Sequence, residues 1–276
     1  MHRVRGQALL LLVALGCPSA TPDAEPAHGG VLHLGGMLAY TLAWDRDGIS
    51  QTPGSGTWSV RNDLGFEFEV QRAFASMYRF ELLPCVWPPI EDAGWGDVAL
   101  RLMQWVGSRT AQAGHSGDPP NPTRLLKWME PFHEPQDVAR AALPSAATSY
   151  CQVHYAVARA DAQTDDVGDA PDLMGQTLVL RGRWRQGSEA WTDFEWISAL
   201  PWGAFQALNY VPGEPSLEAE GAPVKVVVQR PLAALFKGLE PATQRAEVLG
   251  NKVVKALVEG LVVRITTPQG VWQTGP

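Results

Sequence analysis

Short runs in which apolar and polar residues alternate are the feature that most constrains the fold. Residues 66–71 (Phe-Glu-Phe-Glu-Val-Gln) alternate almost without fault, the pattern of a strand with one face in water. Other strand-like runs lie at 31–44, 57–60, 76–85, 151–157, 177–181, 194–197, 224–229 and 261–266. Turn signals separate several of these runs, and strands do not alternate regularly with helices. The sequence therefore predicts a mainly β fold, an antiparallel β-sandwich with helical insertions.

Helices are expected in two places. Residues 241–258 place Ala242, Ala246, Leu249, Val253 and Leu257 on one helical face, which predicts a C-terminal helix that Gly250 could divide. Residues of about 88–148 have another character, with a helical pattern after Asp97 and a second after Pro135. This segment is expected to be a helical insertion. Residues 224–229 lie between Pro223 and Pro231, which favours an edge strand.

The N-terminus has the features of a secretory signal. Arg3 and Arg5 precede an apolar run at 8–15, which is too short to cross a bilayer as a helix, since that takes about 20 residues. Residues 14–17 (Ala-Leu-Gly-Cys) resemble the lipobox of bacterial lipoproteins, in which the cysteine is acylated. We expect a signal peptide at 1–16, a lipidated Cys17, a flexible tether at 17–30 and one globular domain at 31–267.

These features predict a location outside the cytoplasm. The chain would be anchored to a membrane by its N-terminal lipid, in the periplasm or at the outer membrane. If cleavage instead falls near Ala20, the protein would be secreted without an anchor. The formal net charge is −7, which argues against nucleic acid as a partner because phosphates require a basic surface.

Two cysteines remain if Cys17 carries a lipid. In an oxidising compartment Cys85 and Cys151 most simply form a disulfide with each other. Two free thiols that bind a metal are the alternative.

Histidines are the candidate metal ligands. His115 lies in a Gly-rich loop, and His154 occupies the strand face opposite Val153 and Tyr155. His33 and His133 are further candidates. Imidazole suits copper and other transition metals, but no H-x-H or H-E-x-x-H spacing occurs. For any one histidine, a surface or hydrogen-bonded role is the more common alternative.

Tryptophan is over-represented in the composition, with eleven residues. Core packing explains most of them. Trp87, Trp95 and Trp202, in Pro- and Gly-rich loops, could instead form an aromatic platform for a glycan or a protein. The sequence contains no G-x-S-x-G, P-loop, G-x-G-x-x-G or S-x-x-K motif, so no enzyme class is indicated.

Several segments of the sequence resemble a family of proteins, and this resemblance indicates the cellular process in which the protein would take part. The segments Thr57-Trp58-Ser59, residues 62–66 (Asn-Asp-Leu-Gly-Phe), residues 82–85, residues 114–117 and residues 151–155 resemble a group of bacterial exported proteins that accompany the MbnP-like copper-binding periplasmic proteins. The likeness extends over most of residues 31–200. The Tyr-Val-Ser-Asp strand of an MbnP-like protein is absent. The resemblance implies a setting in copper handling, and the missing strand points to an accessory role with periplasmic metal or haem proteins rather than to direct copper binding.

Two functions are expected from the sequence. The first is an exported, lipid-anchored protein that binds a transition metal, copper above all, through His115 and His154, with His33 and His133 as further ligands. The second is a non-catalytic lipoprotein module that binds a periplasmic protein or a glycan through tryptophan-bearing loops. An enzyme without a recognisable motif is a third, weaker hypothesis.

Overall fold

The computed structural model describes residues 32–52, 56–85, 124–168, 171–213 and 223–275. Thirteen strands pair into one sheet. They are β1 (Leu32–Asp45), β2 (Ile49–Thr52), β3 (Thr57–Arg61), β4 (Phe66–Pro84), β5 (Leu125–Pro131), β6 (Val138–Val157), β7 (Leu178–Gln186), β8 (Thr192–Ser198), β9 (Trp202–Ala207), β10 (Asn209–Val211), β11 (Val224–Pro231), β12 (Val262–Thr267) and β13 (Gly270–Gln273). The main helix is α2 (Ala246–Glu259), and two 3-10 turns are η2 (Pro171–Leu173) and η3 (Ala233–Phe236). The mainly β prediction and the C-terminal helix are confirmed.

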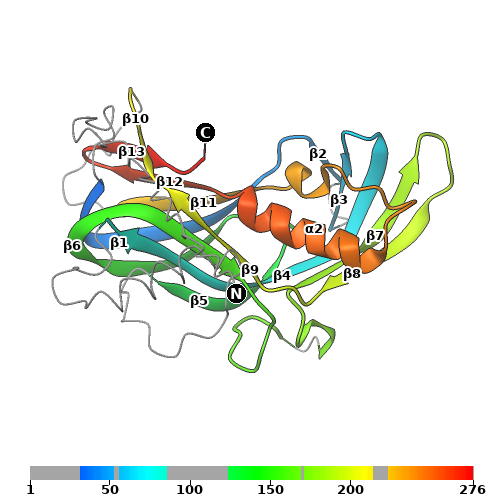
Figure 1. Cartoon of the computed structure of the whole chain (residues 1–276), viewed down its shortest axis with the longest axis horizontal. Coiled ribbons are helices and arrows are strands. Elements are labelled where there is room, and N and C mark those ends of the chain that lie inside the picture. The colour runs from blue at the N-terminus through cyan, green and yellow to red at the C-terminus, as the bar shows by residue number, and fades with distance from the viewer. Residues whose placement is uncertain (1–31, 53–55, 86–123, 169–170, 214–222, 276) are drawn as a thin grey trace, which may run out of the picture.

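Strand β4 joins the two halves of the molecule, because its 19 residues are long enough to belong to both. Its first part, Phe66–Ala75, pairs with β7, and β3 pairs there along the other edge. Its second part pairs with β5 from Phe74 onward and with β6 from Met77 onward. Figure 1 shows β2, β3, β7, β8 and α2 at one end of the molecule and β1, β5, β6 and β10–β13 at the other. We call these ends the helix half and the closed half.

The closed half takes its name from a circuit of strand pairing. The sheet order runs β6–β1–β11–β12–β13–β10. Strand β9 pairs with β6, and β10 follows β9 after Leu208. Residues 202–211 therefore link the two ends of this run of strands, which protects edges that would otherwise be open. The β1–β11 pair is parallel, so the sheet is mixed.

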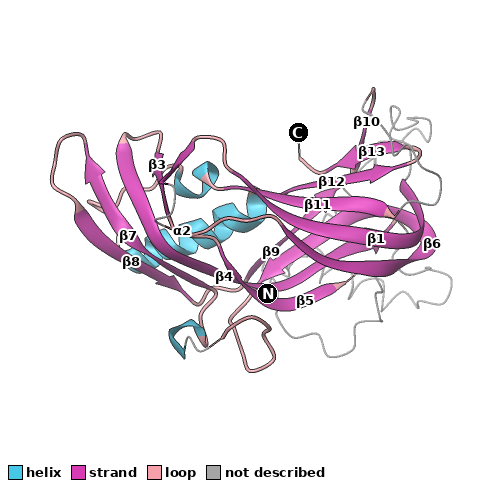
Figure 2. Ribbon diagram, turned by 180° about the vertical axis from the view of Figure 1, so that it is seen from behind, coloured by secondary structure: helices cyan, strands magenta, loops and turns pink. Residues whose placement is uncertain are grey.

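In the helix half the sheet has one covered and one exposed face. Helix α2 turns Leu249, Val253, Val254, Leu257 and Val258 into the core, and Figure 2 shows it alongside β7 and β8. Gly250 does not divide the helix, which is continuous from Ala246 to Glu259. A Cβ added at this glycine would lie 3.0 Å from the carbonyl oxygen of Ile197. The glycine thus allows the helix to approach β8 closely.

Two expectations for individual segments are wrong. The described part of the predicted helical insertion, residues 124–148, forms β5 and most of β6, whereas 88–123 lie outside the described residues. The alanines around residue 142 favour a helix locally, but pairing with β1 decides the outcome. Strand β11 is not an edge strand, since it lies between β1 and β12. Pro223 and Pro231 sit at its ends, where they interrupt little of the ladder.

Candidate functional site

The predicted histidines are held by different parts of the fold. His33, on β1, lies with Nδ1 2.9 Å from Ser149 Oγ. His133, after β5, has Nδ1 3.1 Å from the carbonyl oxygen of Ala73. The Nδ1 of His154, on β6, is 3.1 Å from Glu81 Oε1. His115 lies outside the described residues.

The described histidines are too far apart to share one ion. Ala73 and Glu81, which contact His133 and His154, are eight residues apart on β4, or about 26 Å at the usual rise of a strand. Ser149, which contacts His33, is five residues from His154 on β6, or about 16 Å. In the part of the chain that the structure describes, no three His, Cys, Asp or Glu residues are grouped so that they could hold a metal ion.

His154 has the most developed surroundings of the three. Along β4, Phe80 and Leu82 face the core, so Arg79 and Glu81 face the other side of the sheet. There Glu81 is directly opposite His154 on β6. The Glu81 carboxylate also accepts a hydrogen bond of 2.7 Å from Nε of Arg124, and Arg79 lies at 3.4 Å. The side chain of Glu81 is only 3% exposed, whereas that of His154 is 13% exposed.

The charge of Glu81 determines which ring nitrogen of His154 carries the proton. Burial alone would raise the pKa of the Glu81 carboxyl, but hydrogen bonds from His154 and Arg124 and the charges of Arg79 and Arg124 lower it to about 2. An ionised carboxylate only accepts hydrogen bonds, so Nδ1 of His154 must be the donor. In the neutral imidazole the lone pair is then on Nε2, which makes no hydrogen bond with the described residues.

Phe205 covers one side of this imidazole. It lies opposite His154 on β9, and the two rings stack with their centroids 4.3 Å apart and their planes within 10°. Stacking against one face and a hydrogen bond to Nδ1 together hold the ring in one orientation. The site can therefore offer a single, oriented nitrogen lone pair, to a proton or to a metal ion.

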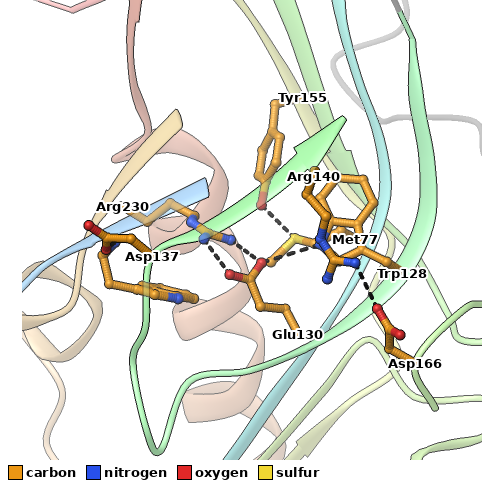
Figure 3. Close-up of polar contacts among 9 residues, drawn as sticks. Met77, Trp128, Glu130, Asp137, Arg140, Tyr155, Asp166 and Arg230 are labelled. Carbon is orange, nitrogen blue, oxygen red and sulfur yellow. Dashed lines mark hydrogen bonds and ion pairs between the residues drawn. The ribbon is translucent and has the colours of Figure 1, made fainter. Parts of the chain in front are cut away.

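A second buried carboxylate lies in the core of the closed half. Glu130 on β5 forms a two-pronged ion pair with Arg230 on β11. Figure 3 shows this pair beside Met77 and Tyr155, whose hydroxyl is directed at the methionine sulfur. Strands β5 and β11 are four places apart in the sheet order, so their direct contact shows that the sheet curls around a core.

Arg230 is enclosed on every side. Its side chain is fully buried, and its guanidinium carbon lies 3.9 Å from the centre of the Trp44 ring. Burial would lower the pKa of Arg230, but the charges of Glu130 and Tyr155 and the hydrogen bonds to both side chains together raise it. Burial also raises the pKa of Tyr155. A ligand cannot reach these groups in the folded protein, so they stabilise the fold and do not form a binding site.

The described tryptophans are mostly core residues, as expected. Five of them are buried: Trp44, Trp58, Trp128, Trp196 and Trp272. Trp202, one of the three platform candidates, is half-buried. Its Nε1 donates to Glu259 at 3.1 Å, and Lys255 lies 4.5 Å from its ring centre. Trp87 and Trp95 lie outside the described residues.

The outer face of the helix half carries alternating charges. Arg183 and Arg185 of β7 pair with Glu69 and Glu67 of β4. The Arg183 hydrogen bond lowers the pKa of the Glu69 carboxyl. Beside them Arg181 pairs with Glu195 in an open hollow that Asp193 also lines. The charges of these pairs offset one another, so we interpret this surface as a solvent-exposed face of the sheet and not as a binding site.

The predicted disulfide is present. Cys85, directly after β4, is bonded to Cys151 on β6. Cys17, the predicted lipidation site, lies outside the described residues. No helix in the described part of the chain is both long and apolar enough to cross a membrane.

The chain was compared with protein families, curated proteins and solved structures. No family model, no curated protein and no solved structure matches it. Sequence reasoning singled out His154 but missed Glu81, Arg124 and Phe205. The alternation along β4 could have placed Glu81 on the face away from the core, and the predicted Cys85–Cys151 disulfide was the signal that β4 and β6 lie side by side.

Proposed function

We propose that this is an exported, lipid-anchored protein of the periplasm or outer membrane that binds copper through His154. One observation carries the proposal: a buried carboxylate accepts the Nδ1 proton of His154 and leaves Nε2 for a ligand. Histidines that bind metals commonly donate their other ring N–H to a carboxylate, which fixes the tautomer and raises the basicity of the ligand nitrogen. His33 and His133 are too distant to join this site.

A second imidazole would have to come from elsewhere in the chain. His115 is the candidate that the sequence offers. It precedes Arg124, whose side chain bonds to Glu81 beside His154, and it follows Cys85, which the disulfide joins to Cys151 on the same strand as His154. Copper bound by two imidazoles fits the preference of this metal for nitrogen ligands.

The alternative function, a module that binds a protein or glycan through tryptophans, has less support. Trp202 is engaged by Glu259 and Lys255 of helix α2 and does not form an open platform. Phe205 is exposed, but it belongs to the His154 site. We therefore favour the metal-binding function.

Calorimetric titration with copper tests the proposal on the mature chain, with the Cys85–Cys151 bond intact. We expect defined stoichiometric binding to the parent protein, at least tenfold weaker binding to His154→Ala, and weaker binding to His115→Ala. His33→Ala is the matched control, because His33 is a histidine of the same sheet whose Nδ1 lies beside a serine hydroxyl and not beside a carboxylate. Equal binding by the parent and His154→Ala would refute the proposal. Intact-mass analysis of the exported protein tests whether Cys17 is acylated.

A further inference from the structure

Strand β5 has β4 along one edge and a single bridging residue along the other. Its seven residues pair with β4. On the opposite edge, the only bridge among the described residues joins Trp128 to Asp165 in parallel. The Asp165 N–H donates to the carbonyl oxygen of Lys127 at 3.1 Å, and the Met129 N–H donates to the carbonyl oxygen of Asp165 at 2.8 Å. One residue thus covers an edge that would otherwise offer its backbone groups to another chain.

The bridging residue belongs to residues 160–167, which we call the strap, and ion pairs attach the strap on both sides of the bridge. Lys127 on β5 bonds to Asp161 at 2.7 Å, and Arg140 on β6 bonds to Asp166 at 2.7 Å. Figure 3 shows the second contact beside Trp128, whose ring centre lies 5.5 Å from the guanidinium carbon of Arg140. The two cations are each 23% exposed, whereas Asp161 and Asp166 are 50% and 54% exposed. The positive charges therefore belong to the sheet, and the negative charges belong to the segment that covers it.

Few apolar contacts hold the strap in place. They are the contacts of Ala160 and Val167 with a small cluster around Met129, which is separate from the main core. Ion pairs that are half exposed to water contribute little to stability. Asp166 has a φ of 60°, a left-handed conformation that is unfavourable for a residue with a side chain. A straight segment with the same charges would avoid this conformation and could pair with more than one residue of β5.

We propose that the edge of β5 that faces the strap is a binding site for a partner protein, and that the strap occupies this site until the partner replaces it. The occupant is an extended, acidic segment of the partner. Its backbone adds a strand to β5, as in other cases of recognition by strand addition, and its carboxylates pair with Lys127 and Arg140. The inference concerns a backbone edge and does not depend on copper binding at His154.

The probe is a fluorescein-labelled peptide with the sequence of residues 160–167, and its matched control has asparagine in place of the three aspartates. The double variant Asp161→Asn/Asp166→Asn, which we call the opened protein, removes the carboxylates that attach the strap. Fluorescence anisotropy at low salt should show about fivefold tighter binding of the acidic peptide to the opened protein than to the parent, in which the strap competes. The asparagine peptide should bind about tenfold more weakly, because it forms no charge-assisted hydrogen bonds. Adding Arg140→Gln to the opened protein should weaken binding of the acidic peptide about tenfold for the same reason.

Hydrogen exchange identifies the surface to which the peptide binds. The acidic peptide should slow amide exchange in β5 of the opened protein and leave exchange in β2 and β3 unchanged. Arg185→Gln is the matched control for Arg140→Gln, because it removes an arginine from an ion pair in the helix half, and it should leave binding to the opened protein unchanged. Urea unfolding of each variant shows that it is folded. No binding of the acidic peptide, equal binding to the parent and the opened protein, equal binding of the two peptides, or no protection in β5 would overturn the inference.

Discussion

Glu130 and Glu81 are two buried carboxylates that the fold uses in opposite ways. Both side chains are 3% exposed, and both are paired with arginine. The partner of Glu130 is the fully buried Arg230, so its charge is neutralised within the core. Glu81 instead bonds to His154 and Arg124, which are each 13% exposed. The first pair joins strands β5 and β11 across the core of the closed half, and the second connects a buried charge to a side chain that a ligand can reach.

The largest loss of stability should come from breaking the buried ion pair between Glu130 and Arg230. Arg230→Met leaves Glu130 as an uncompensated buried charge, which typically costs about 3–5 kcal/mol. Urea unfolding of the variant, compared with the parent, measures this loss. Arg185→Met removes a partly exposed arginine from the helix half and serves as the matched control.

A double variant sharpens the interpretation. Replacing Glu130 with Leu and Arg230 with Met removes both charges, so it should be less destabilising than Arg230→Met alone. If the double variant is at least as unstable as the single one, packing around Trp44 rather than charge neutralisation is the main contribution of this pair to the closed half.

The second effect concerns the pH dependence of stability. The pKa of Glu81 is lowered from 4.5 to about 2 in the folded protein. Its ionised form therefore stabilises the fold above the pKa of the unfolded chain, and this contribution is lost as the pH falls from about 5 to about 2. It amounts to roughly 3 kcal/mol. Denaturant unfolding across this range should show that Glu81→Gln has a shallower decline than the parent. Parallel curves for the two proteins would contradict the assigned role of Glu81.

The smallest effect is expected on the outer face of the helix half. Glu67→Gln removes the partner of Arg185, an ion pair in which both side chains are about one third exposed. Such pairs contribute about 0–1 kcal/mol and weaken with salt. Thermal unfolding at low and high salt should give almost the same stability as the parent. A loss comparable to that in Arg230→Met would remove the distinction between surface and buried pairs.

Much of the fold could be predicted from the sequence because alternation is a local signal. Residues 66–71 indicated a strand on their own, and β4 begins there. The helix predicted at residues 135–143 was wrong. The alanines there favour a helix locally, but the strand is decided by contacts with β1, about a hundred positions away in the chain. The prediction of β11 as an edge strand was wrong for a related reason. Prolines at the ends of a strand indicate where its pairing stops, but not how many neighbouring strands it has.

The site could be predicted only in part. Alternation placed His154 on the face away from Tyr155, and the disulfide followed from cysteine count and compartment. The partners Glu81 and Phe205 are 73 and 51 positions away in the chain. The predicted disulfide indicated that β4 and β6 are neighbours, but no spacing in the sequence places β9 and Phe205 beside His154. The same is true of Arg230 and Glu130, a hundred positions apart.

The tautomer of His154 tests the central claim most directly. Two-bond and three-bond proton–nitrogen correlation spectra of the 15N-labelled protein, recorded without metal above the pH at which the imidazole protonates, distinguish a protonated from an unprotonated ring nitrogen. Our account predicts a proton on Nδ1 and a free lone pair on Nε2, with the preference lost in Glu81→Gln. A proton on Nε2 in the parent protein would contradict it, because the nitrogen that faces a ligand would then already be occupied.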